Sequence, residues 1–232
     1  MEQLSHSAIL AVRLIFNGDP DVLAAVVTSL SVSVAATMIA FCVGAPLGAL
    51  LAIRSFPARR SLLIAVNAML GLPPVVIGLV VYLLLSRAGP LGALGMLFTT
   101  RAMVLAQVLL TLPIVVALAH RSTETGWRDY GDALRIDGAR TLQSIAFLLT
   151  LEGGALLTTF LAAFGRAISE VGAIMIVGGN IREHTRTITT AVVLETSKGE
   201  LALAMALGMI LVAITLLVSA TAFLLHERTS AH

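Results

Sequence analysis

The stretch VLAAVVTSLSVSVAATMIAFCVGAPLGALLAI, residues 22–53, contains no charged side chain. A helix needs about 20 mainly apolar residues to cross the hydrocarbon core of a bilayer. Its backbone groups are then satisfied within the segment, as an environment without water requires. The stretch therefore predicts a transmembrane helix. It is long enough that its GAP segment, residues 44–46, can mark a kink or an exit from the membrane.

The rest of the chain has the same character. Of its 232 residues, 58% are hydrophobic and 12% are charged, and the mean hydropathy is +0.98. These values lie outside the usual range of soluble domains. Four further apolar runs are long enough to span: residues 61–86, 102–119, 141–165 and 201–225. The shorter, glycine-rich run at 171–179 predicts a re-entrant or cavity-lining segment. The expected fold class is all-α integral membrane, with about five transmembrane helices.

Three regions are expected along the chain. Residues 1–21 form a short N-terminal interfacial helix and an outer segment, because their weak apolar run carries Arg13 and no small-residue cleavage site. Residues 22–225 form the transmembrane domain, and residues 226–232 form a cytoplasmic tail. The single cysteine, Cys42, lies in an apolar run, so neither an intrachain disulfide nor a CxxC pair is possible.

The orientation follows from the basic residues, because cytoplasmic loops retain Lys and Arg. One side has eight arginines: Arg54, Arg59, Arg60, Arg121, Arg128, Arg135, Arg140 and Arg228. The other side has six basic residues: Arg13, Arg87, Arg101, Arg182, Arg186 and Lys198. We expect a multi-pass protein of the cell (inner) membrane, with the N-terminus outside, the C-terminus in the cytoplasm, and the loop 121–143 in the cytoplasm.

Charge and motifs exclude several function classes. The 15 basic and 13 acidic residues are spread over the loops, which argues against a nucleic-acid partner. The chain has no GxxxxGK[ST], HExxH or GxSxG motif, and TSKGE at 196–200 lacks the upstream glycine of a phosphate-binding loop. The five histidines and Glu152 show no metal-ligand spacing. The chain is therefore expected not to be an enzyme and to hold no cofactor.

The charged stretch DYGDALRIDGARTLQS, residues 129–144, interrupts the apolar chain. Trp127, Tyr130 and Leu134 stand at i, i+3 and i+7, which predicts a short amphipathic helix with one apolar stripe. Gly138 then permits a turn before the next span. Such a helix either docks on a soluble partner or is a solvated connector, and its acidic residues weaken a pure lipid-surface role.

The same stretch resembles the EAA motif of permease subunits of ABC importers. Asp132, Ala133, Leu134 and then Gly138 stand at the motif's spacing. The sequence departs from the pattern with Asp for Glu, Leu for the second Ala, and Thr-Leu at 150–151 where Leu-Pro commonly ends it. In that family the motif forms the coupling helix that docks into the ATPase subunit. The resemblance implies these coupling residues: Tyr130, Asp132, Ala133, Leu134, Arg135 and Gly138.

Two further segments, GLPPVVIGLVVYLLLSRAGPLG at 71–92 and GRAISEVGAIMIVGGN at 165–180, resemble molybdate and tungstate importer permeases. The segment IREHTRTITTAVVLETSKGE at 181–200 is closer to the tungstate type. The resemblance covers residues 19–225. It implies type I ABC permease architecture and import of tungstate, with a molybdate or sulfate-type permease as the alternative. It also implies a partner ATPase that binds ATP and Mg, and an extracytoplasmic oxyanion-binding protein.

Several residues are candidates for the translocation path or gate. Pro73 and Pro74 remove helix donors, which suits a water-filled cavity but also a passive kink. The glycines let backbones approach an oxyanion or simply pack helices. Arg166 and Glu170, four residues apart, are expected to neutralise each other at the bilayer edge, with either a functional or a structural role. The candidates are Pro73, Pro74, Gly78, Ser169, Glu170, Gly172, Gly179 and Asn180.

Other roles follow from the transport hypothesis. Hydroxyls of Ser169, Thr158 and Thr159 can replace water around an oxyanion. His184 and Arg186, on the outer loop, are expected either to face the binding protein or to be solvated. Five helices without internal repeats make a thin wall around a solvated ion, so a second copy of the chain is expected to complete the path. An ion-coupled carrier or channel without ATP remains the alternative, as does a membrane enzyme or scaffold that no sequence feature favours.

Overall fold

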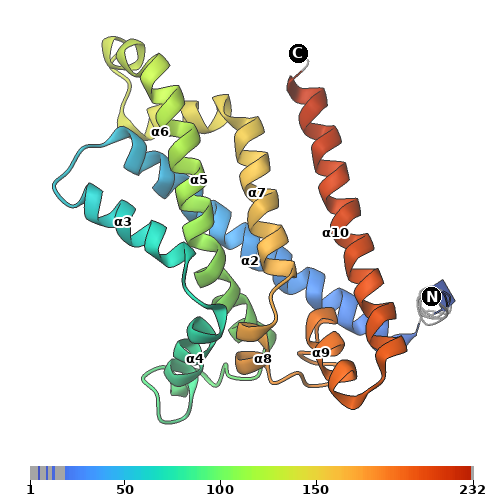
Figure 1. The fold of residues 1–232 in the computed structure, drawn as a ribbon. Coiled ribbons are helices and arrows are strands. Elements are labelled where there is room, and N and C mark those ends of the chain that lie inside the picture. The colour runs from blue at the N-terminus through green and yellow to red at the C-terminus, as the bar shows by residue number, and fades with distance from the viewer. Residues whose placement is uncertain (1–4, 6–8, 10–11, 14–18, 231–232) are drawn as a thin grey trace. The chain divides into compact units, whose positions relative to one another are not determined.

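The computed structural model describes residues 5, 9, 12, 13 and 19–230 (Figure 1). In that part of the chain all regular elements are helical. They are α2 (Pro20–Ile53), α3 (Arg59–Leu70), α4 (Pro74–Leu85), the 3₁₀ helix η1 (Gly92–Leu94), α5 (Thr100–Ile136), α6 (Thr141–Leu151), α7 (Gly153–Ile168), α8 (Gly172–Gly178), α9 (Ile188–Lys198) and α10 (Leu201–Ser230). The predicted N-terminal interfacial helix falls largely outside the described residues.

The five predicted spans correspond to three long helices and two bent pairs. By length and hydropathy α2, α5 and α10 can each cross a membrane. The pairs α3–α4 and α6–α7 reach the required length only together, and they bend by 104° and 80° at their breaks. The all-helical membrane fold is therefore confirmed, and the chain is a multi-pass membrane protein.

The first break lies where the two prolines predicted an interruption. Pro73 is extended, with φ −63° and ψ 128°, and Pro74 begins α4 at its first turn. A proline biases the residue before it away from the helical region, so consecutive prolines stop α3 and restart α4 in a new direction. The prolines thus produce a full break between two helices.

The second break contradicts the prediction of one continuous run over 141–165. Glu152 caps α6 with φ −88° and ψ 23°, and α7 starts at Gly153. The glycine pair at 153–154 has low helix propensity, which explains why the helix is interrupted at this position. Glu152 therefore lies half-buried at a bend, not in the middle of a helix.

The helix α2 does not end at its GAP segment. It runs through Pro46 to Ile53 in a single element. Its small residues serve close packing instead: a Cβ added to Gly48 would lie 2.6 Å from the Val116 carbonyl oxygen of α5. Small residues at such crossings let two backbones approach, which is a main source of helix association in membranes.

The helix α5 is longer than its apolar run predicts. It continues past residue 119 through the charged stretch and ends at Ile136. The prediction of a separate short amphipathic helix is therefore wrong. Residues that leave the bilayer lose their apolar pattern but keep good helix propensity, so the end of hydrophobicity is not the end of the helix.

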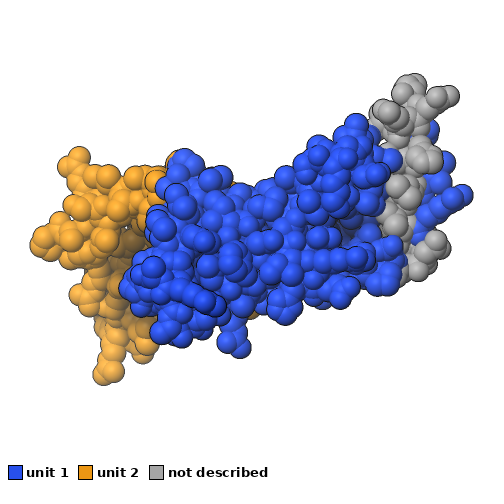
Figure 2. Space-filling view, turned by 90° about the horizontal axis from the view of Figure 1, so that it is seen from below, with its two compact units in different colours: residues 1–35, 73–107, 167–220 blue, residues 36–72, 108–166, 221–232 orange. Residues whose placement is uncertain are grey.

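The described chain forms two compact units, which Figure 2 colours separately. Unit 1 comprises Met1–Ala35, Pro73–Gln107 and Ala167–Ala220, and unit 2 comprises Ala36–Leu72, Val108–Arg166 and Thr221–His232. Unit 1 has a core of residues from α2, α9 and α10, including Ile188 and Leu207. Unit 2 has a core from α2, α5 and α7, including Val115 and Leu156.

Candidate functional site

The charged turn after α5 is closed by a specific set of backbone hydrogen bonds. The amide of Ala139 donates to the Leu134 carbonyl at 2.9 Å, and the amide of Gly138 donates to the Arg135 carbonyl at 3.1 Å. Gly138 has φ +69°. This is a Schellman motif, whose left-handed position strongly favours glycine. The predicted turn at Gly138 is confirmed.

The side chains of the turn form a small charged cluster on α5. Arg135 pairs with Asp132 at 3.0 Å. The Arg135 guanidinium also lies over the Trp127 ring, 5.1 Å from its centroid. Tyr130 meets Phe147 of α6 edge to face at 6.0 Å between centroids. These contacts order the end of α5 without burying it.

The tip of the turn presents both charge and apolar surface. The Asp132 side chain is 92% exposed, and Ile136 and Leu142 are 86% and 78% exposed. Ala133 is also exposed, whereas Leu134 is half-buried. Exposed apolar residues beside charges are typical of a surface that another protein covers.

The link between α2 and α3 supports this turn. Arg54 donates from Nε and Nη2 to the Thr141 hydroxyl, at 3.1 and 2.6 Å. Arg54 and Thr141 line a cavity of about 340 Å³ together with Trp127 and Arg135. Arg54 therefore bonds the start of α6, and it shares one cavity with two residues near the end of α5.

Arg59, the first residue of α3, contacts both α2 and α5. Arg59 donates from Nε to the Leu51 carbonyl and approaches Glu124 at 3.5 Å. Its Nη2 lies 3.2 Å from His120 Nε2. The arginine side chain has no hydrogen-bond acceptor atom, so His120 Nε2 accepts this hydrogen bond. The proton of the neutral His120 ring is then on Nδ1. The base of the turn is thus a connected polar cluster.

The predicted path residues of α4 and α8 serve close packing. These two helices lie side by side (Figure 1). A Cβ on Gly78 would lie 2.7 Å from Ala173 Cα, and one on Gly172 would lie 2.7 Å from Val75 Cγ2. Gly78 is therefore required by the close approach of the α8 backbone, whereas a side chain at Gly172 would have to displace the Val75 side chain. A role of either glycine in a path stays a prediction.

Glu170 is buried, with 3% exposure. Its Oε1 accepts from the Ala173 amide at 3.1 Å, which places a carboxylate at the start of α8. A carboxylate there satisfies helix amides and complements the helix dipole. The predicted pairing of Glu170 with Arg166 stays a prediction, as does a role for the exposed Ser169.

The segment after α8 has an unusual backbone. Gly179 has φ +71° and its Cβ position would meet the Phe98 ring at 2.8 Å. Asn180 follows with φ +50°. Its Oδ1 is buried and has no hydrogen-bond partner among the described residues. Buried polar atoms normally have partners, so Asn180 is a candidate contact for water or an ion.

Sequence reasoning missed a group of buried hydroxyls next to this segment: Thr185, Thr187, Thr189, Thr190 and Ser29. Thr189 donates to the Glu170 carbonyl at 3.0 Å, and Ser29 accepts from the Ile188 amide at 2.8 Å. A role in the path for the hydroxyls of Thr158 and Thr159 stays a prediction. Thr158 and Thr159 donate to carbonyls of their own helix, four residues back. The threonine-rich stretch RTITT, residues 186–190, is the sequence feature that could have indicated this group of hydroxyls.

Replacing Thr187 by valine is expected to lower the midpoint of thermal unfolding in detergent. Thr187 caps α9 by accepting from the Thr190 amide, and it bonds the Thr189 hydroxyl at 2.9 Å. Loss of a cap and of a buried partner costs about 1–3 kcal/mol. The control is Thr196→Val, because Thr196 is an exposed residue that donates only within α9. Equal midpoints for the two variants would contradict this role.

The loop between α8 and α9 carries the two predicted docking residues in different settings. His184 is exposed, as docking requires. Arg186 is half-buried, and its Nε has no hydrogen-bond partner among the described residues. The Arg186 side chain lines a cavity of about 210 Å³ together with Asp19 and Glu195. Nearby, the hydrogen bond with Asp21 raises the pKa of Arg182 above its ordinary value. Docking of either predicted residue stays a prediction.

No protein-family model matches the chain. It is 37% identical over 227 residues to the tungstate uptake system permease protein of Peptoclostridium acidaminophilum, covering 98% of this chain and 100% of that protein. It is 41% identical over 207 residues to a probable anion ABC transporter permease protein of Haloferax volcanii, covering 87% and 89%. It is 32% identical over 191 residues to the molybdenum transport system permease protein of Escherichia coli, covering 76% and 81%.

Proposed function

The chain belongs to the family of tungstate and molybdate permeases of ABC importers, and on that premise we propose that tungstate is the oxyanion it carries into the cell. The observation that carries this proposal is the similarity to a tungstate permease over that protein's full length. The similarity to the molybdenum permease is lower and covers less of both chains. The family membership also identifies the chain as a membrane subunit without catalytic activity of its own.

The proposed coupling site is the turn that ends α5. A partner ATPase binds ATP and Mg and hydrolyses ATP on its own chain, and its movement reaches the permease through this turn. The exposed Asp132, Ile136 and Leu142 support the proposal, because they offer charge and apolar area to a docking protein. The contact of Arg54 with Thr141 supports it too, because the turn is tied to a second loop on the same side.

The rest of the assembly is part of the same proposal. A second copy of the chain completes the path, and an extracytoplasmic binding protein delivers the oxyanion and supplies most of the selectivity. The arginines at 54, 59 and 60 support a cytoplasmic coupling side and an N-terminus outside. The buried Oδ1 of Asn180 is a hydrogen-bond acceptor, so in this proposal it contacts water around a divalent oxyanion and not the oxyanion itself.

Uptake of radiolabelled tungstate tests this function. In cells that lack the chromosomal copy, the plasmid-borne chain is expected to restore uptake when its ATPase and binding protein are present. Excess unlabelled tungstate should compete fully, molybdate less and sulfate least. Inactivating the ATPase should abolish uptake. Persistent uptake without ATP hydrolysis would favour a carrier or channel, and stronger competition by molybdate would make this a molybdate permease.

A further inference from the structure

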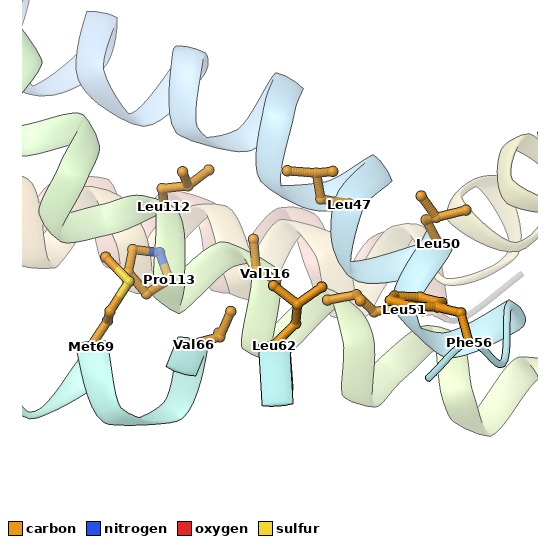
Figure 3. Close-up of a pocket in the computed structure, with 10 residues that line it drawn as sticks. All are labelled: Leu47, Leu50, Leu51, Phe56, Leu62, Val66, Met69, Leu112, Pro113 and Val116. Carbon is orange, nitrogen blue, oxygen red and sulfur yellow. The ribbon is translucent and has the colours of Figure 1, made fainter. Parts of the chain in front are cut away.

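An apolar groove of about 270 Å³ lies between α2, α3 and α5. Figure 3 shows that Phe56 and Leu51 lie at one end, and Met69 and Leu112 at the other. All ten lining residues are apolar. A path for a divalent oxyanion needs polar groups to replace its water, so this groove is not such a path.

The helix α3, which forms one wall of the groove, has no buried residue. Leu62, Val66 and Met69 line it at i, i+4 and i+7, so one helix face points into it. Leu62 and Met69 remain 46% and 38% exposed. In a membrane-spanning chain, the apolar medium that contacts such a face is the acyl region of the bilayer.

The Phe56 end of the groove adjoins a basic link. Arg54 and Arg60 lie within four residues of Phe56, both are exposed, and neither pairs with a carboxylate in the part of the chain that the structure describes. Arg59 differs, because it approaches Glu124 at 3.5 Å and bonds the Leu51 carbonyl. Two exposed arginines without a carboxylate partner among the described residues therefore flank Phe56 in the chain, and Phe56 lines the groove.

We propose that this groove binds an anionic phospholipid, with an acyl chain along α3 and the phosphate at Arg54 and Arg60. The apolar lining matches the chain, and the two cations match the phosphate. Assignment to the cytoplasmic leaflet rests on the proposed orientation, whereas binding itself does not depend on transport. A lipid test can therefore fail while the proposed import of tungstate stands, and the reverse is also true.

Native mass spectrometry of the delipidated, full-length chain tests the proposal, with phosphatidylglycerol, phosphatidylcholine and inorganic phosphate as separate probes. The wild type is expected to prefer phosphatidylglycerol over phosphatidylcholine and not to retain inorganic phosphate. Arg60→Gln should reduce that preference about fivefold, the effect of one cation near an anionic headgroup. Arg87→Gln, at another exposed arginine, is the matched control and should leave it unchanged.

The groove itself is tested by Val66→Trp, which fills it. This variant is expected to lose retention of phosphatidylglycerol, whereas Leu83→Trp on the exposed face of α4 should retain it. The Arg60 variant keeps the test decisive if the tryptophan variant fails to fold, because Arg60 is an exposed surface residue.

Three results would overturn the proposal. In the first, Val66→Trp binds phosphatidylglycerol as the wild type does. In the second, inorganic phosphate binds in place of lipid, which would make the arginines a site for a free anion. In the third, Val66→Trp abolishes a dimer of the chain while lipid binding persists, which would show that a second copy covers the groove.

Discussion

Replacing Gly138 by valine is expected to reduce ATP-driven oxyanion uptake about tenfold or more, with the chain still present in the membrane. Gly138 holds φ +69° at the end of α5, where no atom lies within 4 Å of an added Cβ. The effect is therefore one of backbone conformation and not of a clash. A left-handed residue other than glycine costs roughly 1–2 kcal/mol, and a β-branched side chain costs more. The turn would reopen, and Ile136 and Leu142 would change their relative positions.

Two variants separate coupling from general damage. Gly199→Val imposes the same kind of strain at φ +83°, again in open space, but at the end of α9. It should leave uptake near the wild-type level. Gly138→Asn should retain more activity than the valine variant, because asparagine tolerates the left-handed region. Co-purification of the ATPase provides the second readout, and it should be weakened by Gly138→Val. Normal uptake and normal ATPase binding in Gly138→Val would refute the assignment of the turn.

Replacing Gly78 by valine is expected to have the largest effect on folding. The added Cβ would lie 2.7 Å from Ala173 Cα and 3.1 Å from the Ala173 carbonyl oxygen. Backbone atoms cannot rotate away as a side chain does, so α4 and α8 would have to separate. Overpacking of this kind costs typically 1–3 kcal/mol, and more where the backbone resists. The yield of monodisperse protein and the unfolding midpoint should both fall.

The matched control is Gly208→Val. Gly208 lies inside α10, and its added Cβ would meet nothing within 4 Å. Both substitutions replace a helical glycine by the same residue, so the difference between them measures the contact of α4 with α8. Comparable yields and midpoints for the two variants would show that these helices do not pack as described.

Local chemistry predicted only part of this fold. The break at Pro73 and Pro74 was predictable, because a proline's missing donor acts on its own helix. The continuity of α5 beyond its apolar run was not, because hydropathy reports where a helix leaves lipid and not whether its hydrogen bonds continue. The bend at Glu152 depends on the following glycines, which a hydropathy window averages away.

The sequence likewise predicted one part of the candidate site and missed another. The turn at Gly138 was predictable, because a Schellman motif lies within a few consecutive residues. The buried threonines were missed, because their partners are distant in sequence: Thr189 bonds the Glu170 carbonyl, and the Ile188 amide bonds Ser29. A single chain without its fold does not reveal which hydroxyls meet.

The position of Trp127 has a spectroscopic consequence. It is the single tryptophan of the chain, and the Arg135 guanidinium lies 5.1 Å from its ring centroid. An indole so placed is sensitive to the charge and water around it. The tryptophan emission of this subunit therefore originates entirely beside the turn that ends α5, and it provides an intrinsic optical reporter there without any attached label.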